Sequence, residues 1–211
     1  MDDLTNEEIV LAGLGSLEGR RGNLRNAVKG EVGASKYRKH FLERVHKFPR
    51  NIQKALMNGR AQISDAPYYA TGEIQGSRCE IIKPSQPEQI GITNIDNGKL
   101  GKDRFLVLSA IKVLWDSEAI DGRFTTSGDA HFLNGEWELE INGKKVFEKM
   151  PMRKFHDAFF GYKTDVPYGT YVLDNPKIID PQTPIEFNIT FPGQVQGFLK
   201  VFFEGTTIYG Y

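Results

Sequence analysis

Alternation of apolar and polar residues is clearest around residues 136–141, where tryptophan, leucine and isoleucine alternate with three glutamates. This period of two is typical of a strand with one buried face and one solvated face. Asn142-Gly143 follows at once, and these residue types readily adopt the positive φ angles of a type I′ turn. The pattern therefore predicts a tight hairpin, and we expect Val146 to lie opposite Leu139 on the returning strand.

Several other segments carry strand patterns. Residues 105–115 are apolar at both odd and even positions, which is typical of a central strand covered on two sides. Further strands are predicted at 185–191 and 198–209, with weaker signals at 68–75, 78–83 and 170–173. Short strands between Gly, Pro, Asn and Asp loops, without long helical patterns, predict a mainly β protein built as an antiparallel β-sandwich. A jelly roll is the wiring we expect, although strand spacing alone leaves an immunoglobulin-like wiring open.

The first 60 residues show helical patterns instead. Thr5 and Glu8 form a capping box for a short helix, and repeated glycines between Gly13 and Gly33 predict a flexible connector. A second helix is predicted from Ser35, because apolar residues recur near helical spacing up to residue 48. We therefore divide the chain into a helical, basic N-terminal arm (1–60) and a sandwich domain (61–211).

Charge supports this division. The chain has 27 basic and 27 acidic residues, yet residues 16–60 contain twelve Lys and Arg against three Glu, a net charge of +9. Residues 61–211 contain 15 basic and 20 acidic residues, a net charge of −5. A basic arm on a mildly acidic body can follow a polyanion or bind an acidic neighbour.

Composition excludes several classes of protein. Hydrophobic residues make up 39% and charged residues 26%, values of an ordinary folded protein rather than a disordered chain. No apolar run approaches the roughly 20 residues that span a bilayer, and the acidic start differs from a signal peptide, so we expect synthesis in a cytoplasm. The single Cys79 excludes an internal disulfide, and we expect it to be a buried, inert thiol.

Catalytic motifs are weak. The four histidines lack metal-ligand spacing, and we expect His131 and His156 in surface loops. The glycines of 13–19 lack the lysine of a phosphate-binding loop. We therefore predict no enzyme activity, no cofactor and no metal site. A metal site formed by Asp129, His131 and the glutamates of 136–140 is the least favoured alternative.

Aromatic residues suggest a second function class. The chain has 14 Phe, 8 Tyr and 2 Trp, several of them in or beside expected loops, including Tyr162, Tyr168 and Tyr171. Exposed aromatic loops favour protein interfaces or stacking on sugars. A carbohydrate-binding or adhesion module is therefore the alternative to a role in assembly.

Three stretches carry a family resemblance: 66–74 (APYYATGEI), 133–143 (LNGEWELEING) and 183–192 (TPIEFNITFP). They resemble segments of structural proteins of bacteriophages, including tailless ones, and a basic arm before a sandwich is similar to the layout of jelly-roll virion proteins. The resemblance implies a non-enzymatic capsid or capsid-associated protein that resides in the virion, self-associates and binds other virion proteins.

The arm would then contact a neighbouring subunit or the packaged genome. The residues expected to make this contact are Arg20, Arg21, Arg25, Lys29, Lys36, Arg38 and Lys39.

Overall fold

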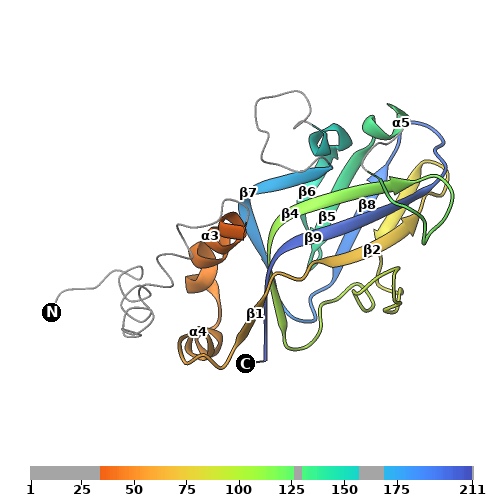
Figure 1. Ribbon diagram of the computed structural model, residues 1–211. Helices are drawn as coiled ribbons and strands as arrows, with labels where there is room; N and C mark the ends of the chain where they lie inside the picture. Colours follow the sequence, from red (N-terminus) through yellow and green to blue (C-terminus); the bar gives the residue numbers. More distant parts are fainter. Residues whose placement is uncertain (1–33, 126–129, 157–168, 211) are drawn as a thin grey trace.

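The computed structural model describes residues 34–125, 130–156 and 169–210. The expected first helix and the glycine-rich connector lie outside these residues. The strands, labelled as in Figure 1, are β1 (Gln62–Ser64), β2 (Tyr68–Glu73), β3 (Arg78–Ile82), β4 (Arg104–Asp116), β5 (Glu136–Ile141), β6 (Lys144–Pro151), β7 (Thr170–Ile179), β8 (Ile185–Thr190) and β9 (Phe198–Tyr209). The helices are α3 (Ala34–Arg44), α4 (Arg50–Met57) and α5 (Ala130–Leu133), with 3₁₀ turns η1 (Val45–Lys47) and η2 (Met152–Phe155).

The strands form two antiparallel sheets, as the sequence predicted. Sheet A has the order β1-β9-β4-β7, with β2 also paired to β9, and sheet B has the order β3-β8-β5-β6. Four of the ladders are nested: β2 pairs with β9, β3 with β8, β4 with β7, and β5 with β6. The chain therefore runs out through β2 to β5 and returns through β6 to β9, and it changes sheet at each step except at the β5–β6 hairpin, which lies within sheet B.

The main core lies between the two sheets. Trp137 on β5 is fully buried there, and its ring lies 5.1 Å from that of Phe147, 5.3 Å from Phe155 and 5.6 Å from Phe187, between ring centroids. Tyr171, expected near a loop, lies on β7 with its ring 5.7 Å from Trp137. This aromatic cluster joins both sheets and η2 in one apolar unit.

A second, smaller core lies on the outer face of sheet A. Leu106 and Leu108 of β4 point to the main core, whereas Phe105 and Val107 contact the helical region. Phe48 packs edge-on against Phe105 at 5.6 Å between ring centroids. Helices α3 and α4 thus cover one end of sheet A (Figure 1), and this cover explains why β4 is apolar on both faces.

The helix predicted from Ser35 is confirmed: α3 begins one residue earlier, at Ala34, and η1 continues its path. The type I′ turn is also present, with φ of 55° at Asn142 and 69° at Gly143. The expected register is wrong, because Leu139 pairs with Phe147 after a shift in the ladder next to Glu140. The ladder shifts at two places, between Trp137 and Leu139 and between Leu139 and Glu140, and the turn sequence does not encode these irregularities.

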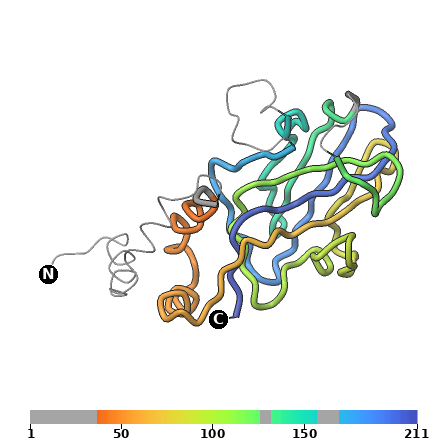
Figure 2. Tube along the Cα trace, in the orientation of Figure 1, coloured from red at the N-terminus to blue at the C-terminus, as the bar shows by residue number. Residues whose placement is uncertain are grey.

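The connection from β3 to β4 lies along β2 (Figure 2). The backbone N–H of Asn94 donates to the Tyr69 carbonyl at 3.1 Å, and the Asn94 side chain donates to the Pro67 carbonyl at 3.0 Å. These bonds, with an isolated bridge between Ala70 and Thr93, hold the long connection along the edge of β2 that does not pair with β9. Among the described residues, no helix has the length and apolarity to cross a bilayer.

Candidate interaction surfaces

The helical region presents a strongly basic surface. Residues 34–60 contain eight Lys and Arg and one acid, Glu43. Phe41, Phe48 and Ile52 are buried against sheet A, so the polar sides of α3 and α4 remain in solvent. We call this surface the cationic helix surface, and its exposed members are Arg38, Lys39, Lys47, Arg50, Lys54 and Arg60.

Two polar contacts join α3 to sheet A. The Tyr37 hydroxyl donates to Oε2 of Glu204 on β9 at 2.7 Å, and Arg44 donates to the Asn175 side chain on β7. Burial is the main cause that raises the pKa of the Tyr37 phenol above its ordinary value, and the hydrogen bond to the Glu204 carboxylate adds to it. These contacts tie α3, which carries Arg38 and Lys39 of the cationic helix surface, to sheet A.

The predicted contact residues divide between described and undescribed parts of the chain. Lys36, Arg38 and Lys39 belong to α3, and the last two are exposed. The remaining four, Arg20, Arg21, Arg25 and Lys29, lie outside the described residues. Sequence reasoning stopped its list at Lys39, although the same count of charges continues through Arg50, Lys54 and Arg60 in α4 and just beyond it.

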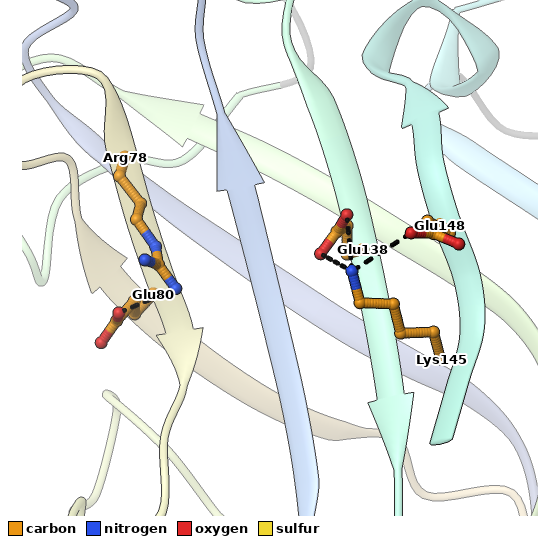
Figure 3. Close-up of polar contacts among 5 residues, drawn as sticks. All are labelled: Arg78, Glu80, Glu138, Lys145 and Glu148. Carbon is orange, nitrogen blue, oxygen red and sulfur yellow. Dashed lines mark hydrogen bonds and ion pairs between the residues drawn. The ribbon is translucent and has the colours of Figure 1, made fainter. Parts of the chain in front are cut away.

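The outer face of sheet B carries the opposite charge (Figure 3). Because apolar residues of β5 and β8 point inward, the alternating polar residues point outward, and neighbouring strands bring carboxylates together. Glu140 lies opposite Glu186, and Glu138 lies opposite Asn188. We call this surface the carboxylate face: Glu80, Glu136, Glu138, Glu140, Glu148 and Glu186.

Basic residues neutralise only part of the carboxylate face. Lys145 Nζ lies 3.4 Å from Glu138 Oε2 and 3.3 Å from Glu148 Oε1, and Arg78 lies 3.2 Å from Glu80 (Figure 3). The hydrogen bond to Glu148, followed by that to Glu138, raises the pKa of the Lys145 ammonium. Within the described residues, the other three carboxylates of the face have no ion-pair partner: Glu136, Glu140 and Glu186. The exposed Lys144 and Lys149 lie on the edge strand β6.

The two charged surfaces are on opposite sides of the sandwich. The main core fills the space between the inner faces of the sheets. The helices cover one end of the outer face of sheet A, and the carboxylate face is the outer face of sheet B. One molecule therefore presents a cationic exterior on one side and an anionic exterior on the other.

A third feature is an aromatic group on the uncovered part of sheet A. Lys200 Nζ lies 4.7 Å from the ring centre of Tyr69, 5.5 Å from that of Phe124 and 5.8 Å from that of Phe202. The same nitrogen donates to the Gly91 carbonyl at 2.7 Å, and burial lowers the pKa of the Lys200 ammonium. The chain's own lysine thus occupies the position that an external cation would take over these rings.

Reactive side chains are placed mostly in the interior. Burial raises the pKa of the Cys79 thiol to about 12, which keeps it protonated and unreactive at neutral pH, as expected from the sequence. His156 is buried beside Phe132, so its expected place in a surface loop is wrong; its neighbour Phe155 belongs to the aromatic cluster and carries it inward. Of the alternative metal site, Asp129 and the His131 side chain lie outside the description. The described residues contain no group of three His, Cys, Asp or Glu side chains arranged to hold a metal ion.

The described surface thus includes two large charged areas and an aromatic patch occupied by a lysine. No protein-family model matches the chain, and the curated proteins contain no significant relative. The function must therefore be argued from these surfaces and from the strand pairing.

Proposed function

We propose that this chain is a non-enzymatic structural protein of a bacteriophage virion, a capsid or capsid-associated subunit that associates with copies of itself or with other virion proteins. The observation that carries the proposal is the placement of a cationic exterior and an anionic exterior on opposite sides of one rigid sandwich. Such a molecule is complementary to itself in a head-to-tail arrangement, which generates rings or extended arrays. Many copies multiply weak contacts, so no deep interface is needed in each subunit.

The strand pairing supports the finer fold assignment. We propose that the sandwich is a jelly roll, because its eight longer strands pair in the nested order that follows from wrapping one long antiparallel hairpin into two sheets. Jelly rolls with two four-stranded sheets occur in viral capsid proteins, and also in lectins and cupins. The wiring therefore supports a virion role by analogy, and the charged exteriors are an independent argument for assembly.

In this proposal the basic N-terminal region contacts either a neighbouring subunit or the packaged genome. Both partners present negative charge, the carboxylate face in one case and phosphates in the other. Contact with phosphates would weaken steeply with salt and show little sequence preference, because it depends on release of counterions.

The test is sedimentation velocity and electron microscopy of the purified full chain at low and high salt. Regular multimers are expected at low salt and monomers near 1 M salt, where charges are screened beyond about 3 Å. Only monomers at every salt concentration and at high protein concentration, with no binding to other virion proteins, would contradict the proposal.

Charge-reversal variants locate the contact. Glu138→Lys with Glu186→Lys should abolish multimers, Arg50→Glu with Lys54→Glu should do the same, and a mixture of the two variants should restore association. Arg123→Glu with Asp121→Lys changes two exposed charges in the loop after β4, outside both surfaces, and serves as the matched control. A different result would point to the genome: only Arg50→Glu with Lys54→Glu would reduce association, and single-stranded DNA would bind the wild-type protein in competition with the neighbouring subunit.

A further inference from the structure

A pocket lies at the end of the sandwich opposite to α3 and α4, where β2 and β4 end and β9 begins (Figure 1). Its volume is about 470 Å³, within the roughly 300–1,000 Å³ of small-molecule sites. The lining residues are Glu73, Ile74, Gly76, Ser117, Gln194, Val195, Gln196, Gly197 and Phe198. Neither the cationic helix surface nor the carboxylate face contributes to it.

Backbone hydrogen bonds fix the walls of this pocket. The Ile74 N–H donates to the Gly197 carbonyl at 2.9 Å, and the Val195 N–H donates to the Gly76 carbonyl at 2.9 Å. The segment before β9 is therefore tied to the end of β2 and the following turn. A ligand would meet these walls already in place, which reduces the entropy lost on binding.

Gly197 holds the segment close to β4. Its φ is 133°, and a Cβ at this position would lie 2.7 Å from the Asp116 carbonyl oxygen and 3.0 Å from Trp115 Nε1. Glycine is thus required both by the backbone conformation and by the close approach. Ser117, the residue after Asp116, forms another wall of the pocket.

Four polar side chains of the lining are available to bind a ligand. The Glu73 carboxylate, the Ser117 hydroxyl and the amides of Gln194 and Gln196 make no hydrogen bond or ion pair with another described residue. Phe198 and Val195 are half-buried and supply apolar surface beside them. The pocket therefore combines planar acceptors and donors with an aromatic ring.

The residue types narrow the ligand. The lining contains no Lys, Arg or His, so nothing compensates the charge of a phosphate or sulfate. A single carboxylate does not make a site for a divalent cation, which takes several oxygen ligands. A neutral sugar matches what remains, because its hydroxyl groups pair with amides and a carboxylate while its C–H face packs on an aromatic ring.

We propose that this pocket is a binding site for a neutral saccharide, with Glu73, Gln194 and Gln196 holding the sugar hydroxyls and Phe198 packing on the ring. The site differs from the loop tyrosines Tyr162 and Tyr168 of the alternative function, which lie outside the described residues. It does not rest on the proposed assembly, since a monomeric variant retains every residue of the pocket.

The experiment is a glycan array probed with the full-length protein, carrying neutral oligosaccharides that end in glucose, galactose, mannose or N-acetylglucosamine, beside sialylated and sulfated glycans. Binding to at least one neutral glycan is expected, and calorimetry with that oligosaccharide gives its dissociation constant. Binding to no neutral glycan, or to anionic glycans alone, would overturn the proposal.

Variants place the binding in the pocket. Gln194→Ala, Gln196→Ala and Glu73→Gln should each weaken the affinity tenfold or more, because each removes or weakens hydrogen bonds to the sugar without burying a new group. These residues are exposed, so the fold should persist, which circular dichroism checks. Gln89→Ala is the matched control, an exposed glutamine outside the pocket. An equal loss in Gln89→Ala, or no loss in the three pocket variants, would place the sugar elsewhere and refute the assignment.

Discussion

The two cores of this protein differ in extent and in what they hold together. The core between the sheets contains 26 buried residues of the described chain and joins eight strands, whereas the core under the helices contains six and joins α3, η1 and α4 to the outside of sheet A. Burial of apolar area is the dominant stabilising contribution, so the sandwich should be far more stable than the attachment of the helices. The cationic helix surface is thus carried by the part of the molecule that is easiest to release.

The largest effect is expected from Trp137→Ala, in the middle of the main core. The indole contacts rings from β6, β8 and η2, and its removal leaves a cavity that rigid strands on both sides cannot fill. Loss of a fully buried tryptophan costs about 3–5 kcal/mol of unfolding free energy. Denaturant unfolding followed by far-UV circular dichroism measures this loss.

Two further variants test whether the main core is centred on Trp137. Trp115→Ala is the control: Trp115 is only partly buried, at the margin of the main core near the end of β4, and its truncation should cost less stability. Trp137→Phe should also lose less than Trp137→Ala, since a ring is retained and a buried N–H without a hydrogen-bond partner is removed. Equal losses at the two tryptophans would contradict a core centred on Trp137.

The main core is also the part that sequence predicted best, for a physical reason. Alternation in β5 and β8 is a local signal of one buried face, and both strands were placed correctly. The predicted register of the returning strand was wrong by one residue, because Leu139 pairs with Phe147. A bulge depends on contacts with other strands, which the turn sequence does not contain. Which strands pair with one another within each sheet depends on residues far apart in the sequence, so alternation along one strand does not predict it.

Glycines in strands illustrate the same limit. A Cβ on Gly205 would lie 1.9 Å from the Val107 carbonyl oxygen, beside the irregularity in the ladder between β4 and β9. Glycine inside a strand indicates a bulge or a close approach, but the sequence does not name the strand that approaches.

The sequence predicted some parts of the candidate surfaces and not others. The basic count in residues 16–60 was visible directly, as was the row of glutamates on β5. Glu80 and Glu186 join that row only through pairing of β3 and β5 with β8, so the size of the carboxylate face could not be predicted. The pocket was missed entirely, because Glu73, Ser117 and Gln194 come from three distant segments.

A smaller effect is expected from Ile52→Ala, in the core under the helices. Ile52 is the buried residue of α4, and truncation costs about 2–5 kcal/mol locally, which is enough to release the helices. Hydrogen exchange should show faster exchange in α3 and α4 with little change in β5 and β8. Met57→Ala, at a residue 39% exposed on the same helix, is the control and should leave exchange unchanged. Equal acceleration in the helices and in sheet B would show that the two cores unfold as one unit.

The smallest effect is expected from Tyr37→Phe, which removes only the hydrogen bond between α3 and Glu204 of β9. A hydrogen bond to a charged acceptor contributes about 1.5–3 kcal/mol, and partial exposure of this pair places the loss toward the lower value.

The pH dependence of the unfolding free energy distinguishes the contribution of this hydrogen bond from that of apolar packing. Because burial raises the pKa of Tyr37 in the folded protein above its ordinary value of 10.0, the unfolded chain releases the phenolic proton first.

The Tyr37 contribution is therefore complete below pH 10 and decreases as the pH rises above it. Unfolding free energies of the wild-type protein and Tyr37→Phe, measured by urea at pH 8 and pH 10.5, should differ more at pH 8. Tyr209→Phe, at a half-buried tyrosine on the same strand as Glu204, is the matched control for the loss of a hydroxyl group. A difference that stays constant between the two pH values would mean that the helices are held by apolar contacts alone, and that the bond to Glu204 does not position the cationic helix surface.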